Sequence, residues 1–150
     1  MANYSREIAH MLDRLYTKIL SQDKNGYFKN DIVLRLNLME LIIIKRVGEA
    51  ETIRLNMLID ALEIDRNLVT QAIKKLCSMK IAQKNKDPED GRGQCISLLP
   101  AGHAIHGQIL ELQKDELDFI LSDVTINEEK TILKFISKMV QYHTEKFEIK

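Results

Sequence analysis

One short segment of the chain has the residue types and spacing expected for binding a polyanion. Acidic and basic side chains balance to a net charge of zero, yet residues 66–86 include six bases and no acid: Arg66, Lys74, Lys75, Lys80, Lys84 and Lys86. A neutral protein that gathers its positive charge in this way is expected to present it to an anionic partner. Double-stranded DNA is the leading candidate, because each phosphate that Lys or Arg neutralises releases condensed counterions. A solvated surface that binds nothing is the simpler alternative.

The helix expected from Arg66 to about Met79 would hold these bases away from a buried face. Asp65 is a suitable N-cap, because its carboxylate can accept from the free N–H groups of the first turn. The apolar positions recur at helical spacing: Val69, Ala72, Ile73 and Leu76. A helix fits the major groove of B-DNA, with short polar side chains on base edges and basic ones on phosphates. We expect base contacts from Asn67, Thr70 and Gln71, and phosphate or flanking-base contacts from Arg66, Lys74 and Lys75.

A polar loop follows, and its residues suit a tight turn between two strands. Residues 87–93 are Asp-Pro-Glu-Asp-Gly-Arg-Gly, and we expect strands over residues 81–86 and 94–98. A hairpin beside a groove-binding helix can reach the next minor groove, whose negative potential attracts arginine. Arg92 is expected to make that contact. Asp90 is expected either to hold an arginine or to accept from N–H groups of the loop, and so to fix its shape.

The remaining elements are expected to be helices. Apolar residues between residues 55 and 62 predict a short helix directly before the basic one, so that the two form a helix-turn-helix. Asn37 and Glu40 match a capping box, and the run Leu41–Ile44 predicts a buried helix that Gly48 would end. Apolar stripes also predict a helix near the N-terminus, one that Pro100 opens, and a last one beginning at Asn127.

Composition limits the function classes. A hydrophobic fraction of 45% and a charged fraction of 29% fit a globular domain. We see no signal peptide, the most apolar run is too short to span a bilayer, and two cysteines suggest reduced thiols in the cytoplasm. The sequence shows no Gly-rich phosphate loop, no nucleophile elbow and no paired carboxylates with an obvious cleft. We therefore expect a binding protein, not an enzyme, with no cofactor and no membrane partner.

Two pairs of residues suggest sensing chemistry. Cys77 and Cys95 could form a redox switch. No helix N-terminus or obvious cation pocket near either cysteine would stabilise a thiolate, so ordinary buried cysteines are expected. His103 and His106 lie three residues apart on a helix, with Glu111 near, and could present metal ligands. Without a third clear ligand, we expect plain polar residues on the helix surface.

Between Leu58 and Gly102 the sequence resembles, without gaps, the winged helix-turn-helix of MarR-type transcriptional regulators. Residues 58–64 are similar to the family's supporting helix, residues 65–76 to its recognition helix, and residues 87–92 to its wing signature. Asp90 and Arg92 occupy the two most characteristic wing positions. Glu63 and Lys80 depart from the pattern, since the family often has glycine at both. A left-handed turn at Glu63 would cost roughly 1 kcal/mol.

This resemblance implies a mainly α fold with a small β-hairpin wing, in which a winged helix-turn-helix is joined to N- and C-terminal dimerisation helices. The expected parts are an N-terminal dimerisation helix and loop (1–35), a DNA-binding region (36–100) and C-terminal dimerisation helices (101–150) of one compact subunit. It also implies a homodimer on a pseudo-palindromic operator. Relatives often bind small-molecule effectors, so an effector-responsive repressor is expected.

Two other functions stay open on the sequence alone. A winged helix can keep its shape and bind a protein instead of DNA, although the polar residues at the base-facing positions favour DNA. A protein of the same fold can also be a sensor driven by metal binding or thiol oxidation.

Overall fold

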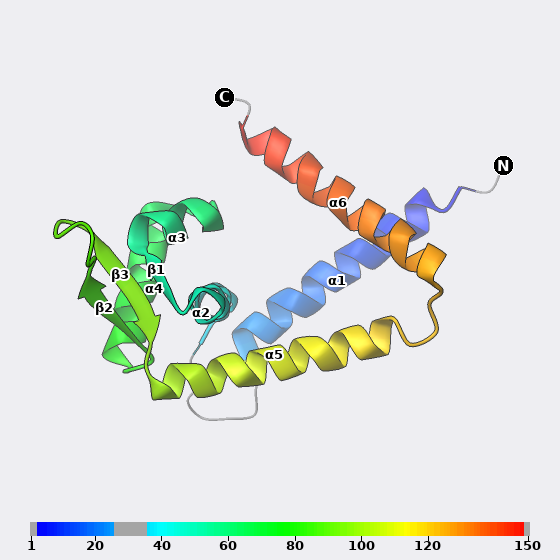
Figure 1. The fold of residues 1–150 in the computed structure, drawn as a ribbon. Helices are drawn as coiled ribbons and strands as arrows, with labels where there is room; N and C mark the ends of the chain where they lie inside the picture. The colour runs from blue at the N-terminus through cyan, green and yellow to red at the C-terminus, as the bar shows by residue number, and fades with distance from the viewer. Residues whose placement is uncertain (1–2, 26–35, 149–150) are drawn as a thin grey trace. The chain divides into compact units, whose positions relative to one another are not determined.

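The computed structural model describes residues 3–25 and 36–148, which form a mainly helical fold with one small sheet (Figure 1). In chain order the elements are α1 (Ser5–Asn25), α2 (Leu38–Ala50), β1 (Thr52–Arg54), α3 (Leu55–Leu62), α4 (Arg66–Ser78), β2 (Ala82–Lys86), β3 (Gln94–Leu98), α5 (Pro100–Ile120) and α6 (Ile126–Glu148). The chain divides into two compact units within α5, between Ile109 and Leu110. No described helix is long and apolar enough to cross a membrane. The expected fold class, a winged helix-turn-helix with additional terminal helices, is confirmed.

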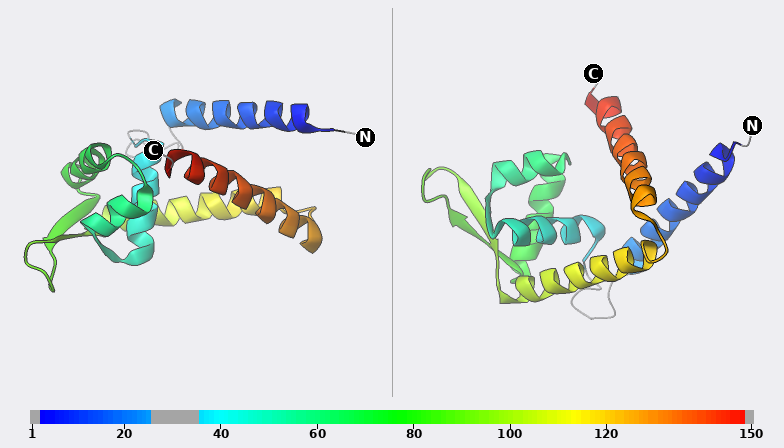
Figure 2. Two further views of the ribbon diagram at one scale, coloured as in Figure 1. Left: turned by 90° about the horizontal axis from the view of Figure 1, so that it is seen from above. Right: turned by 45° about the vertical axis from the view of Figure 1, so that its right-hand side comes forward.

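The three strands form one antiparallel sheet in the order β1-β3-β2. β2 and β3 make the expected hairpin, in which Lys86 pairs with Gln94 next to the loop. β1 lies on the other side of β3, where Arg54 pairs with Cys95. The sequence did not predict β1, because three residues are too few to show an alternating pattern. Both views in Figure 2 show the hairpin loop extending away from the nearby helices.

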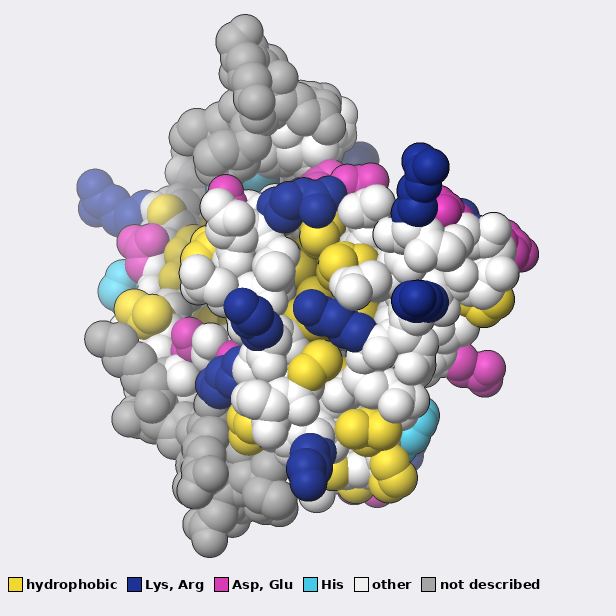
Figure 3. All heavy atoms as spheres, turned by 90° about the vertical axis from the view of Figure 1, so that its left-hand side faces the viewer, with side chains coloured by type: hydrophobic (Ala, Val, Ile, Leu, Met, Phe, Trp, Pro, Cys, Tyr) yellow, Lys and Arg dark blue, Asp and Glu magenta, His cyan; other side chains and the backbone are white. Residues whose placement is uncertain are grey.

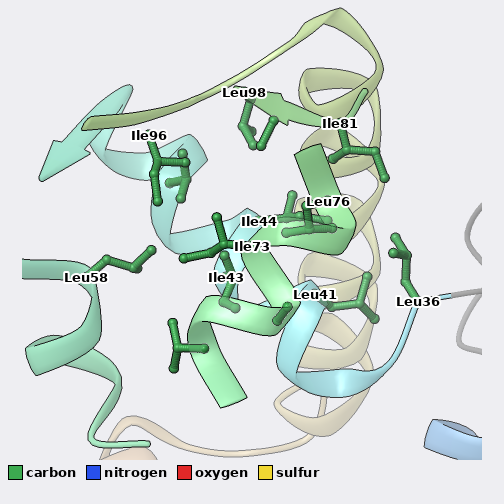
Figure 4. Packing of buried hydrophobic residues seen from close by; sticks show 14 of the residues in the cluster. Leu36, Leu41, Ile43, Ile44, Leu58, Ile73, Leu76, Ile81, Ile96 and Leu98 are labelled. Atoms are coloured by element: carbon green, nitrogen blue, oxygen red, sulfur yellow. The ribbon is translucent and has the colours of Figure 1, made fainter. Parts of the chain in front are cut away.

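The core lies where α2, α3, α4 and the sheet meet (Figure 4). α2 is at its centre: Ile43, Ile44 and Val47 are at most 1% exposed. Of the apolar run Leu41–Ile44 that was predicted to be buried, Ile42 is 38% exposed and the other three residues are buried. The facing elements contribute side chains that are equally buried: Leu58, Val69, Ile73, Leu76, Ile81 and Ile96. Full burial of one such side chain is worth about 1.5–3 kcal/mol. The winged helix region therefore has a hydrophobic core of its own.

α2 begins as predicted but ends later. The backbone N–H of Glu40 donates to Oδ1 of Asn37, the backbone N–H of Asn37 donates to Oε1 of Glu40, and both distances are 2.9 Å. This pair is the expected capping box. The prediction that Gly48 ends the helix was wrong, because α2 continues to Ala50. A Cβ atom at Gly48 would lie 2.4 Å from Nδ1 of His106, so the glycine is needed for the close approach of α5.

Glu63 and Lys80, the two positions at which MarR-type regulators often have glycine, both have a left-handed backbone. Glu63 has φ 55° and ψ 30°, and Lys80 has φ 59°. Lys80 ends α4 in a Schellman motif, in which its N–H donates to the Cys77 carbonyl at 3.0 Å and the Ile81 N–H donates to the Leu76 carbonyl at 2.9 Å. These turns therefore keep the glycine geometry, and each non-glycine residue costs about 1 kcal/mol.

The two C-terminal helices begin at different kinds of residue. Pro100 opens α5 as predicted. α6 begins at Ile126 after a second capping box, in which Thr125 N–H donates to Oε1 of Glu128 at 3.0 Å and Glu128 N–H donates to Oγ1 of Thr125 at 3.2 Å. Hydrogen bonds from Thr125 to the Glu128 carboxylate, first that of the backbone N–H and then that of the side chain, hold the pKa of Glu128 below its usual value. Asn127, which was expected to begin this helix, lies inside its first turn.

Candidate nucleic-acid interface

α4 has the polarity expected of a recognition helix. Its N-cap is Asp65, whose Oδ1 accepts from the N–H groups of Asn67 at 2.9 Å and Leu68 at 3.3 Å. One side of the helix is buried in the core through Val69, Ala72, Ile73 and Leu76. The opposite side is exposed and consists of polar or basic residues: Asn67, Gln71, Lys74 and Ser78. The helix therefore offers hydrogen-bonding groups and one lysine to solvent.

Arg66 and Thr70 lie on one flank of this exposed side. Arg66 is exposed, and its Nη2 donates to Oδ1 of Asn56 at 3.0 Å, which links the start of α4 to α3. Thr70 is half-buried. The guanidinium of Arg66 is thus held by one hydrogen bond on the protein surface, which leaves other N–H groups for a phosphate or a base.

Lys75 lies on the opposite flank and has a partner within the protein. Its Nζ is 2.9 Å from Oε1 of Glu40, the same oxygen that accepts from the N–H of Asn37. The Glu40 side chain is 3% exposed, and that of Lys75 is 40% exposed. Because a buried carboxylate needs a counter-charge, Lys75 serves first to link α4 to α2. The sequence pattern alone did not distinguish it from Lys74.

The wing is a loop held by its own backbone and carboxylates. Asp87 N–H donates to the Gly93 carbonyl at 2.9 Å, and Gly93 N–H donates to the Asp90 carbonyl at 2.9 Å. Oδ1 of Asp90 also accepts from Arg92 N–H at 3.0 Å. The second role expected for Asp90, that of accepting from the loop N–H groups, is therefore confirmed. The Arg92 side chain is exposed and makes no hydrogen bond or ion pair within the described part of the chain.

One residue of this surface was missed by sequence reasoning. Arg54, on β1, places Nε 2.7 Å from Oδ2 of Asp87 and Nη2 2.7 Å from Oε2 of Glu89. These contacts span more than thirty positions of sequence, so no local pattern could indicate them. Arg54 is therefore the arginine that the wing carboxylates hold.

The side of the molecule that carries the hairpin is mainly polar and basic. Figure 3 shows Lys and Arg side chains spread over polar surface on this side, with acidic side chains mostly toward the margins. Apolar side chains lie between the basic ones. Two exposed apolar residues belong to the helix-turn-helix itself: Met57 of α3 is 59% exposed and Leu68 of α4 is 51% exposed. Such a surface can contact phosphates, base edges and thymine methyl groups.

Of the sensing residues considered from the sequence, Cys77 lies on α4 and Cys95 on β3, where it pairs with Arg54, whereas the two histidines lie on α5. Both cysteines are free and half-buried, and burial raises the pKa of the Cys77 thiol, partly offset by Lys84. His103 is exposed as expected, whereas His106 is half-buried against Gly48. Among the described residues, no three His, Cys, Asp or Glu side chains form a group that could hold a metal ion.

Comparisons with known proteins agree with this geometry. No protein-family model and no curated protein matches the sequence. Among solved structures, FabT of Streptococcus pneumoniae in complex with DNA is similar with a TM-score of 0.79 at 15% identity, covering 95% of this chain and 99% of FabT. BpsR of Bordetella bronchiseptica is similar with a TM-score of 0.65 at 19% sequence identity, and the match covers 89% of this chain and 98% of BpsR. The reduced form of MarR from E. coli is similar with a TM-score of 0.62 at 21% sequence identity, and the match covers 85% of this chain and 95% of MarR. The chain thus has the winged helix fold of MarR and these related structures.

Proposed function

We propose that this protein is a sequence-specific, double-stranded DNA-binding transcriptional regulator. One observation carries the proposal: a helix with a buried apolar side and an exposed polar side, α4, occurs with a wing whose arginine side chain is exposed. This combination is found on a fold shared with FabT, which was solved in complex with DNA. The arrangement fits binding to a nucleic acid.

Each part of the surface has a role in this proposal. α4 enters the major groove, where Asn67, Thr70 and Gln71 read base edges. Arg66 and Lys74 neutralise phosphates or contact flanking bases. Arg92 enters the adjacent minor groove, and Asp90 keeps the loop in the shape that presents it. Lys75 contributes mainly by supporting α4 through Glu40.

The regulator acts as a homodimer in this proposal. Three helices carry large apolar side chains that are exposed in the single chain, including Met11 and Leu15 of α1, Leu117 and Ile120 of α5, and Leu133, Ile136 and Val140 of α6. Apolar surface on this scale is expected to be covered by another molecule. A second copy supplies equivalent helices and places a second α4 about one DNA turn away, so the operator is a pseudo-palindrome.

The finer regulatory proposal is an effector-responsive repressor in the cytoplasm. DNA binding by BpsR is regulated by 6-hydroxynicotinic acid, and we extend to this chain only the general feature that a small molecule alters DNA affinity. In vitro transcription from a promoter that contains a selected site tests the sign of regulation. Less transcript on addition of protein is expected, and more transcript would make the protein an activator.

The decisive experiment is selection of bound duplexes from a random pool. We expect enrichment of an inverted repeat, and an affinity for it that falls with salt by a slope of about −0.9 per neutralised phosphate. Recovery of no preferred sequence, with binding no tighter than for random DNA, would overturn the proposal. In that case a protein-binding winged helix becomes the better explanation.

A thiol-driven sensor of the same fold is the second candidate function, because Cys77 and Cys95 are both free. The raised pKa of the Cys77 thiol disfavours the reactive thiolate. The selected duplex separates the two candidates: DNA affinity should be the same before and after a chelator or peroxide. A loss of affinity that a reductant reverses would favour the sensor.

A further inference from the structure

The wing has a charge problem if it approaches DNA. Its loop contains three carboxylates, Asp87, Glu89 and Asp90, and one basic residue, Arg92. Carboxylates near a phosphate backbone repel it, and like-charge contacts across an interface are costly. The structure contains a feature that removes much of this repulsion.

Arg54 lies on β1, the strand farthest from β2 in the sheet, and reaches the loop that joins β2 to β3. Its Nε and Nη2 lie 2.7 Å from a carboxylate oxygen of Asp87 and Glu89, respectively. The Asp87 side chain is 5% exposed, whereas that of Glu89 is 82% exposed. One guanidinium thus neutralises a buried carboxylate and an exposed one.

The same contacts set the conformation of the loop. Oδ1 of Asp87 accepts from Glu89 N–H at 3.0 Å, while Oδ2 of the same side chain receives Arg54. A Cβ atom at Gly93 would lie 3.4 Å from Cβ of Asp87, so Asp87 packs under the loop that presents Arg92. Arg54 therefore fixes the base of the wing and, through Glu89, also its exposed side.

We infer that Arg54 positions the wing and masks its carboxylates, so that Arg92 can approach DNA without repulsion from Asp87 and Glu89. This inference rests on the proposed DNA-binding function and adds a residue outside the helix and the loop. The planar fork of arginine is required, because a single lysine ammonium cannot present two separated, fixed N–H groups to two carboxylates.

A double-mutant cycle on the selected duplex tests the masking. Arg54→Gln removes the charge, and we expect affinity to fall about tenfold. Glu89→Gln in the wild-type background should change affinity less than about twofold, because that carboxylate is already neutralised. The double variant Arg54→Gln/Glu89→Gln should bind the duplex about threefold more tightly than Arg54→Gln alone. Arg54→Lys should rescue only part of the affinity, because it restores charge without the fork.

A structural role alone would give a different pattern. If Arg54 only supported folding, removing Glu89 would restore nothing and thermal stability would fall in step with affinity. An Arg54→Gln variant that binds like the wild type, or an equal loss in both Glu89 backgrounds, would overturn the inference. If the wild-type protein itself selects no duplex, the proposed function fails instead, so the two failures are distinguishable.

Discussion

The winged helix region and the terminal helices differ in how they bury their apolar side chains. In residues 36–109, Ile44, Val47 and Leu58 are 0% exposed. In α6, by contrast, Leu133 is 68% exposed and Val140 is 61% exposed. The first region has its core within one chain, whereas the terminal helices present an apolar stripe to the surroundings. DNA reading and assembly should therefore be separable by mutation.

The largest effect is expected from a charge placed in the apolar stripe of α6. Ile136 is 51% exposed in the single chain. Ile136→Glu would bury a carboxylate in the proposed dimer interface, so it should give a monomer by analytical ultracentrifugation. Without the second half-site, affinity for the palindrome should fall by about a hundredfold or more.

The control for this prediction is Lys134→Glu, which changes the charge of α6 by two units where Ile136→Glu changes it by one. By helical spacing, Lys134 is on the other side of α6 from Ile136, and it is exposed. Lys134→Glu should leave both the dimer and the affinity for the duplex nearly unchanged. A dimeric Ile136→Glu variant would show that the apolar stripe of α6 is not the dimer interface. The terminal helices would then not be the part of the chain that assembles.

The second prediction concerns the packing of the winged helix region itself. A Cβ atom at Gly102 would lie 2.2 Å from the backbone oxygen of Ile81, whereas a Cβ atom at Gly107 would have no neighbour within 4 Å in the described part of the chain beyond its own helix backbone and adjacent residues. Gly102→Ala should lower the free energy of unfolding by about 1–3 kcal/mol. Gly107→Ala should be neutral or stabilising, because alanine is the better helix former. Urea unfolding of both variants makes the comparison, and equal stabilities would mean that the contact relaxes freely.

These contacts also show what the sequence could and could not predict. The capping box at Asn37, the limits of α4 and the β2–β3 hairpin depend on neighbouring residues, so local patterns identified them. β1, the packing of Gly48 on His106 and the contacts of Arg54 depend on residues far apart in the chain. Nothing in a single sequence indicates such pairs. The base-reading residues could be proposed from the polarity of α4. The pairing of Lys75 with Glu40 could not, because the two residues lie far apart in the sequence.

The third prediction tests the wing without touching either core or dimer. The Arg92 side chain is exposed, and its backbone N–H, not its guanidinium, holds Asp90. Arg92→Ala should therefore weaken binding to the selected duplex by about 1–3 kcal/mol while thermal stability stays nearly constant. A gel-shift titration at fixed salt measures the affinity. An unchanged titration would remove the wing from the mechanism and leave α4 as the sole reader.

The smallest effect separates two adjacent lysines of α4. Lys74 is exposed, whereas Lys75 is paired with the buried Glu40 at 2.9 Å. Lys74→Met should reduce the slope of log affinity against log salt by about 0.9, the value for one phosphate contact, with little change in stability. Lys75→Met should do the reverse: it leaves Glu40 without its cation and should lower stability by about 1–2 kcal/mol, with the slope nearly unchanged. If Lys75→Met reduces the slope as much as Lys74→Met does, Lys75 leaves Glu40 to contact a phosphate when DNA binds, and the link between α4 and α2 is not permanent.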